Sequence, residues 1–262
     1  MQIDAEYQKL RDLLSELISN GCTGIKLSAE DQGAPFEFID MVHKRIINGA
    51  VPLHVKIGGP DARNDIRTCL EMGVTGIIAP MVESPFGVHK FVTAVEEIAG
   101  ENIAKQLFLS INLESLSAYE KVDDILMMKE INAIDEMVVG TSDLATSVGK
   151  PKSDPVVLDI VEQMCMKFKK AGKIVRVGGL MTVFLSRQDF ADRMIKGGVV
   201  DEVNTSTVAI DVKKVKDLQS AYLKAINFEY QLNEFWSLIY GKRLEQFRKK
   251  AASLRKILDT KS

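Results

Sequence analysis

Short β-rich runs alternate with helical stretches along most of this chain of 262 residues. This alternation constrains the fold most strongly, because strands joined by helical crossovers run parallel to one another. Right-handed crossovers curl such a sheet in one direction, so seven or eight units within roughly 200 residues predict a closed (β/α)8-type TIM barrel. We expect strands at Thr23–Ser28, Leu53–Ile57, Gly76–Ala79, Leu107–Leu113, Glu136–Val139, Ile174–Val177 and Glu202–Ser206.

The two ends of the chain depart from this rhythm. Residues 4–19 have the apolar spacing of a helix. An eighth strand is either hidden or missing, and we allow for an incomplete or atypical first strand of the barrel. We therefore assign residues 1–210 to the barrel with its N-terminal helix and 211–262 to a C-terminal helical extension. The aromatic residues of that extension are Phe228, Tyr230, Phe235, Trp236 and Tyr240. They belong either to the core or to a subunit interface, and we expect a homo-oligomer.

Composition excludes several classes of function. The chain is 46% hydrophobic and 27% charged, as in an ordinary globular protein, and its net charge of −2 gives no attraction for nucleic acid or anionic membranes. Three widely spaced cysteines and the absence of a signal-like or membrane-length apolar run favour a cytoplasmic protein. We expect no nucleic-acid or membrane partner, so any anionic ligand needs a local site.

Polar residues alternate with apolar ones along strands that should be buried on both faces. Because helices cover the outside of a barrel, the polar residues must point inward, where an unpaired charge costs several kcal/mol. Either internal salt bridges or a functional site would explain them. The inward polar residues are Lys26, Glu30, Lys56, Asn112, Glu114 and Arg176. Among them, Glu30, Lys56 and Glu114 lie at the C-terminal ends of their strands, where barrel active sites are built.

Several strand-to-helix loops are rich in small residues. Gly58-Gly59-Pro60, the 140–144 loop and Gly178-Gly179 allow a ligand to approach backbone N–H groups at helix N-termini, which suits a carboxylate or phosphate. Asp143 fits either a helix cap or a functional carboxylate. Glu114 and Asp143 end neighbouring strands, so their carboxylates can meet. Two hard oxygen ligands with open positions for water and substrate favour Mg²⁺ or Mn²⁺ over zinc.

The histidines show no spacing typical of metal ligands. His43 and His89 fall within helical stretches, and His54 lies well below the end of its strand. We expect His54 to be a core residue.

Three segments resemble the HpcH/HpaI aldolase and citrate lyase β-subunit family. They are VKIGGPDARNDIRTCLEMGVTGIIAPMVESPFGVHKFV, then NLES, then VVGTSDLATSVGK. The resemblance covers residues 22–150 well, extends loosely to about 210 and does not reach the C-terminal helices. It implies a TIM barrel with a divalent metal on Glu114 and Asp143. It also implies a pyruvate or oxaloacetate unit, with its carboxylate at the N–H groups of Ser142 and Asp143, and oligomers that exchange C-terminal helices.

Two positions depart from the family pattern. Lys56 stands where the family has an arginine, which keeps the charge but loses the planar fork. The stretch Ala29-Glu30-Asp31-Gln32 lacks the acid/base histidine of the aldolase branch. Either Glu30 or Asp31 takes over that role, or the chain is not an aldolase.

The resulting prediction is a metal-dependent (class II) aldolase or carbon–carbon lyase that acts through the enolate of a 2-oxo acid. Its partners would be a small 2-oxo acid and an aldehyde or acyl-CoA. Lys56 would stabilise the oxyanion, while Lys26, Arg176 and Asn112 would contact the substrate. Alternatives are a citryl- or malyl-CoA-type lyase, a Schiff-base aldolase through Lys56 or Lys26, and a non-catalytic 2-oxo-acid-binding barrel.

Overall fold

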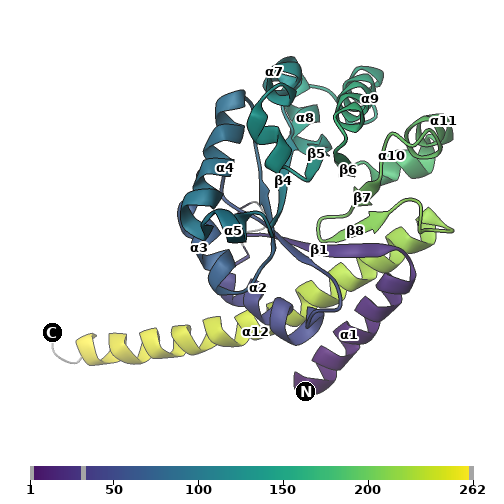
Figure 1. Cartoon of the computed structure of the whole chain (residues 1–262). Helices are drawn as coiled ribbons and strands as arrows, with labels where there is room; N and C mark the ends of the chain where they lie inside the picture. Colours follow the sequence, from purple (N-terminus) through teal and green to yellow (C-terminus); the bar gives the residue numbers. More distant parts are fainter. Residues whose placement is uncertain (1–2, 31–33, 260–262) are drawn as a thin grey trace.

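Eight strands close into a barrel in the order β1 to β8 (Figure 1). The computed structural model of the chain describes residues 3–30 and 34–259. The strands are β1 (Cys22–Ser28), β2 (Leu53–Lys56), β3 (Gly76–Ala79), β4 (Phe108–Leu113), β5 (Glu136–Gly140), β6 (Ile174–Gly178), β7 (Glu202–Asn204) and β8 (Val208–Asp211). The predicted TIM-barrel fold is therefore confirmed.

Helices surround this barrel (Figure 1). Most are short because the long crossovers are broken into two or three pieces. They are α1 (Ile3–Ser19), α2 (Phe36–Met41), η1 (Val42–Ile47), α3 (Arg63–Glu71), α4 (Pro85–Ala99), α5 (Glu101–Ala104), α6 (Leu116–Glu120), α7 (Val122–Leu126), η2 (Lys129–Ala133), α8 (Thr141–Val148), α9 (Pro155–Lys170), α10 (Met181–Ser186), α11 (Gln188–Ala191), η3 (Asp192–Lys196) and α12 (Leu218–Asp259).

All seven predicted strands are present, and the hidden eighth is Val208–Asp211. β8 runs antiparallel to both β7 and β1, while the other neighbours pair in parallel. Residues 205–207 separate β7 from β8, which is too short for a crossover and forces a hairpin. The atypical strand is thus the antiparallel eighth. β1 is a complete seven-residue strand that pairs in parallel with β2, and its only irregularity among the described pairings is a register shift between Cys22 and Gly24 against β8.

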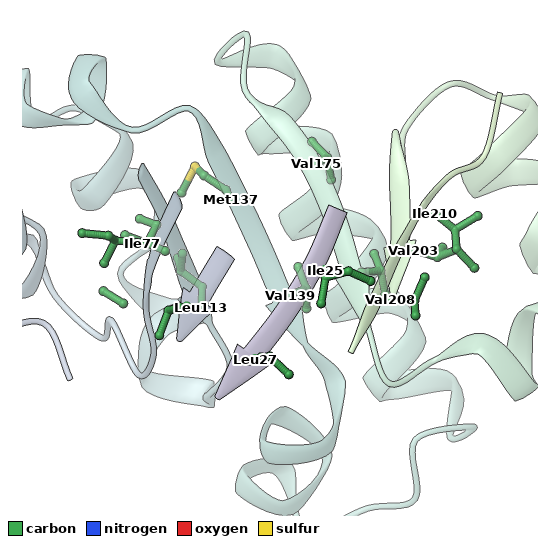
Figure 2. Packing of buried hydrophobic residues seen from close by; sticks show 14 of the residues in the cluster. Ile25, Leu27, Ile77, Leu113, Met137, Val139, Val175, Val203, Val208 and Ile210 are labelled. Atoms are coloured by element: carbon green, nitrogen blue, oxygen red, sulfur yellow. The ribbon is translucent and has the colours of Figure 1, made fainter. Parts of the chain in front are cut away.

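The alternation along the strands separates two layers as expected. Apolar side chains of the strands are buried against the helices, and Figure 2 shows part of this layer: Ile25, Leu27, Ile77, Leu113, Met137, Val139, Val175, Val203, Val208 and Ile210. The three cysteines are free and buried, and this burial raises the pKa of each thiol. The polar side chains between the apolar ones fill the barrel interior.

The C-terminal stretch is one helix, α12, and it packs along α1 and β8. Its N-terminal half buries Phe228 and Phe235, with Phe235 edge-on to Tyr7 at 5.2 Å. Tyr230 is 57% exposed. The C-terminal half extends away from the barrel (Figure 1), so part of the aromatic set is core, while the predicted subunit contact stays a prediction. In the described part of the chain, every helix is too short or too polar to cross a membrane.

A network of charges fills the barrel below the cavity described in the next section. Arg176, only 2% exposed, contacts Glu136 at 2.8 Å and Glu202 at 2.7 Å. Ser110 Oγ donates to Glu136 Oε2 at 2.7 Å. Burial raises the pKa of Glu136 to about 7, although the charge of Arg176 lowers it. In this layer the salt-bridge interpretation of the inward charges is confirmed.

His54 is a core residue, as expected, and it should make stability depend on pH. It stacks on Phe108 at 4.7 Å, and burial, then the Arg176 charge, lower its pKa to about 3. As the pH falls below ~6.5, His54 takes up a proton in the unfolded state but not in the folded state. The free energy of unfolding therefore decreases by about 1.4 kcal/mol per pH unit between pH ~6.5 and pH 3. Urea unfolding between pH 7.5 and 5 should show a flatter pH dependence for His54→Leu. The exposed control His89→Leu should keep the wild-type slope, and an unchanged slope in His54→Leu would contradict the assignment.

Candidate active site

A cavity of about 350 Å³ opens at the C-terminal ends of the strands. Barrel active sites form at this end, because the strand-to-helix loops converge there. Most of the side chains singled out from the sequence line it: Lys26, Lys56, Asn112, Glu114, Ser142, Asp143 and Arg176. The barrel thus brings together residues that are spread over more than half of the chain.

Glu114 follows the end of β4 and is 3% exposed. Its Oε1 accepts from the Met81 N–H at 3.0 Å, and its Oε2 accepts from Asn112 Nδ2 at 3.2 Å. Burial raises the pKa of Glu114, the Met81 N–H and the charge of Lys56 lower it, and the charge of Asp143 raises it further. The two carboxylates therefore lie close enough to repel each other.

The backbone around Glu114 is adapted to hold it. Met81 adopts φ 52°, a left-handed conformation that is unusual for a residue with a side chain and that concentrates at functional sites. This places its N–H on the carboxylate. On the other side, the missing side chain of Gly140 leaves the room that Glu114 occupies, because a Cβ there would lie 2.0 Å from Glu114 Oε2.

Gly140→Ala should therefore displace the Glu114 carboxylate. We expect cation affinity to fall at least about tenfold, comparable to losing the groups that orient a metal ligand. Titration calorimetry with Mn²⁺ would measure it. The control is Gly241→Ala, because a Cβ at this position of α12 meets no other described atom, and this variant should bind Mn²⁺ as the wild type does. Gly149→Ala is unsuitable as a control because Gly149 has a positive φ. Normal Mn²⁺ binding by Gly140→Ala would show that this close approach does not matter.

Asp143 and Ser142 lie in the first turn of α8, and both are exposed at the cavity. The N-cap of α8 is Gly140, so Asp143 lies inside the first turn and the interpretation of Asp143 as a helix cap is wrong. The first N–H groups of a helix have no partner within it and carry a partial positive charge. This end of the cavity is suited to a carboxylate.

Lys56 ends β2 and is 4% exposed. Its Nζ lies 3.0 Å from Glu30 Oε2, while Glu30 is 38% exposed at its side chain. Glu30 is outside the set of described residues that line the cavity and instead forms an ion pair beside it. Asp31, the other predicted acid/base residue, lies outside the described residues.

The structure shows what already surrounds two of the predicted substrate contacts, Arg176 and Asn112. Arg176 reaches the cavity floor, but Glu136 and Glu202 already balance its charge, which counts against binding an acidic group of the substrate. Asn112 Nδ2 donates to Glu114, and among the described residues none donates a hydrogen bond to its buried Oδ1. Lys26 lines the cavity on the β1 side, as predicted.

Sequence reasoning missed one wall of the cavity. It is formed by the β7–β8 turn and the first turns of α12, through Asn204, Thr205, Ser206, Tyr222, Ile226 and Glu229. The sequence predicted a strand over Glu202–Ser206, and the C-terminal end of that strand forms part of this wall. No local pattern could show that a helix from the C-terminal extension would cover it.

The donor set fits a divalent cation only as a partly open site. Among residues 3–30 and 34–259, no three His, Cys, Asp or Glu side chains converge. Glu114 and Asp143 supply two hard oxygen donors, and each hydrogen-bonded oxygen of Glu114 retains a lone pair. A Mg²⁺ or Mn²⁺ ion usually keeps several water or substrate ligands, so two carboxylates suffice and would lose their mutual repulsion.

Fold and site together define a TIM barrel with an acidic and cationic cluster at the C-terminal ends of its strands. Residues 54–177 match the family HpcH/HpaI aldolase/citrate lyase. This match confirms the resemblance seen in the sequence.

One curated relative is a 2-keto-3-deoxy-L-rhamnonate aldolase from Klebsiella pneumoniae, 27% identical over 135 residues. The match covers 42% of this chain and 49% of the relative, so the chain spans about half the length of that relative.

Solved structures share the fold. An HpcH/HpaI aldolase from Desulfitobacterium hafniense aligns with a TM-score of 0.58 at 16% identity, covering 83% of this chain and 87% of its own. An HpcH/HpaI aldolase/citrate lyase family protein from Burkholderia cenocepacia gives 0.57 at 16% identity, with 87% and 98% covered. A variant of the citrate synthase SbnG gives 0.55 at 18% identity, with 83% and 99% covered. At these identities the likeness concerns the fold alone.

Proposed function

We propose that this protein is a carbon–carbon lyase of the aldolase type that acts through the enolate of pyruvate or a related 2-oxo acid. The observation that carries the proposal is the convergence of Glu114 and Asp143, from neighbouring strands, on one cavity with Lys56. The family match over residues 54–177 and the aldolase relative support the reaction type.

Glu114 and Asp143 would hold Mg²⁺ or Mn²⁺, which when bound supplies Lewis acidity at the 2-oxo group. The substrate carboxylate would lie at the N–H groups of Ser142 and Asp143, because that helix end is the favourable place for an anion in the cavity. The oxo group would then face Lys56. Its positive charge, buried and close to Glu114, stabilises negative charge that develops on the oxo oxygen.

Cleavage of a 4-hydroxy-2-oxo acid needs one proton removed and one returned. A base takes the proton of the C4 hydroxyl, the C3–C4 bond breaks, and its electron pair passes into the enolate of pyruvate. The aldehyde leaves, and the enolate takes a proton at C3. Glu30 is our candidate for this proton transfer, since its carboxylate pairs with Lys56 at the edge of the site.

Exchange of the pyruvate methyl protons for deuterium tests the proposal, because enolisation needs no aldehyde. Proton NMR in D₂O should show exchange with Mg²⁺ or Mn²⁺ and its loss with EDTA. Borohydride treatment with pyruvate would trap a lysine adduct only in a Schiff-base enzyme. Absence of exchange at saturating metal would refute the enolate proposal, and trapping that persists in EDTA would replace it with the Schiff-base mechanism.

A further inference from the structure

One face of α12 borders the cavity. Tyr222, Ile226 and Glu229 line the cavity and follow one another at i, i+4 and i+7, so they share this face of the helix. The adjacent face belongs to the core, where Ala225 and Phe228 are fully buried. Ile226 is instead 39% exposed, and Tyr222 is half-buried. Two large side chains of α12 therefore keep surface that a ligand in the cavity can cover.

The carboxylate of Glu229 is occupied by groups of the protein. It accepts from Thr205 Oγ1, from Ser206 Oγ at 2.9 Å and from the Thr207 N–H at 2.5 Å. Thr205 Oγ1 accepts in turn from the Val208 N–H at 2.9 Å. These bonds fix the β7–β8 turn against α12 and use its polar groups within the protein. What this face of α12 offers a ligand is therefore mainly the apolar surface of its other two residues.

Met181 continues this surface on the neighbouring helix. It is the first residue of α10 and lines the same cavity, and α10 contacts α12. Methionine is flexible and polarisable, so its side chain adapts to apolar groups of different shape. Together, Met181, Tyr222 and Ile226 form what we call the apolar wall of the cavity.

The apolar wall and the charged residues lie in different halves of the barrel. Lys56, Glu114 and Asp143 lie at the ends of β2, β4 and β5, whereas the apolar wall follows β6 and lies on α12, which contacts β8. A cavity of about 350 Å³ has the size of sites that hold ligands much larger than three-carbon pyruvate. Pyruvate bound in the charged half would therefore leave space along the apolar wall.

We propose that the apolar wall is the aldehyde subsite, and that it selects aldehydes that carry a hydrocarbon chain of several carbons. The inference rests on the proposed function. In the addition direction, the enolate carbon of pyruvate bonds to the aldehyde carbon. The electron pair of the carbonyl double bond moves to the aldehyde oxygen, which takes a proton from Glu30 in the reverse of the cleavage step. The hydrocarbon chain leaves water and packs against the apolar wall, whose residues determine specificity and take no part in bond making.

The test compares pentanal with propionaldehyde in addition to pyruvate, by kcat/KM. The two are unbranched aldehydes of similar carbonyl reactivity, so the ratio of their kcat/KM values reports on how the two extra methylene groups are bound. Each methylene group that is buried in an apolar site raises kcat/KM roughly three- to tenfold. We therefore expect the wild type to prefer pentanal by about tenfold or more.

Ile226→Asn places an amide on the apolar wall and should lower this preference roughly threefold or more. Ile226→Thr, a smaller change, should lower it in the same direction. Both residues have nearly the helix propensity of isoleucine, and the position is partly exposed, so α12 should be retained, which circular dichroism checks. Leu223→Asn is the matched control, because Leu223 lies on the same helix, is 58% exposed and is outside the described residues that line the cavity. It should keep the wild-type ratio.

Three outcomes would overturn the inference. They are a wild-type enzyme that uses propionaldehyde as well as pentanal, an unchanged ratio in both Ile226 variants, or an equal change in Leu223→Asn. The pyruvate proton exchange of the wild type is measured in the same samples. Exchange without addition of either aldehyde also rejects the subsite alone, whereas absence of exchange rejects the proposed function and the subsite with it.

Discussion

Glu114→Gln is expected to remove cation binding and to slow pyruvate proton exchange by about 10²- to 10³-fold. The substitution keeps the shape of the side chain but removes its negative charge, which a hard cation requires. It also places an amide beside Asn112 Nδ2 and the Met81 N–H, two donors that now face the carboxylate. At least one of them would lose its acceptor.

Calorimetric titration with Mn²⁺ measures the binding, and proton NMR measures the exchange. Glu120→Gln provides the matched control, because it makes the same charge change at an exposed position at the end of α6. It should behave as the wild type in both measurements. Mn²⁺ binding that survives in Glu114→Gln with exchange intact would place the metal elsewhere.

Arg176→Met is expected to destabilise the protein by about 3–5 kcal/mol, because it leaves the buried carboxylate of Glu136 and the half-buried carboxylate of Glu202 without their cation. Glu136 is fully buried and Glu202 has only 14% of its side chain exposed, so water cannot replace the guanidinium. Urea unfolding monitored by circular dichroism gives the free energy of unfolding. Arg193→Met, which breaks an exposed pair with Glu162, should leave the midpoint within error.

A triple variant separates lost charge balance from lost packing. Arg176→Met combined with Glu136→Gln and Glu202→Gln removes every charge of the network and should recover much of the stability. If Arg176→Met instead stayed fully stable but lost pyruvate affinity, Arg176 would be a substrate ligand, as the sequence had suggested.

The strand rhythm predicted the barrel because each parallel strand carries its own local signal. Runs such as Ile174–Val177 are apolar enough to be recognised individually, and the crossover rule then leaves few arrangements. β8 was missed because its four residues provide barely one alternation, and its antiparallel direction follows from a three-residue turn. Its residues had been assigned to the end of the barrel segment and the start of the extension.

For the inward charges, the sequence left two interpretations, and the structure assigns them to different layers. Lys56 and Glu114 lie at the strand ends and line the cavity, whereas Arg176 lies lower and pairs with Glu136 and Glu202. Position along a strand predicted the first group. Glu136 was not recognised as the partner of Arg176, because the pairing depends on side-chain reach across the barrel.

The sequence by itself determined the barrel, its polar interior and the inward position of Glu114, because these follow from short-range patterns and from the rule that strand ends converge. Those patterns left Asp143 open between a helix cap and a functional carboxylate, and the family resemblance implied its pairing with Glu114. Only the tertiary structure decided that Glu229 reaches the site, since the contact joins α12 to a turn 22 to 24 residues earlier in the chain. It also decided that Gly140 makes room for Glu114. Both depend on how separate elements pack, which no local pattern records.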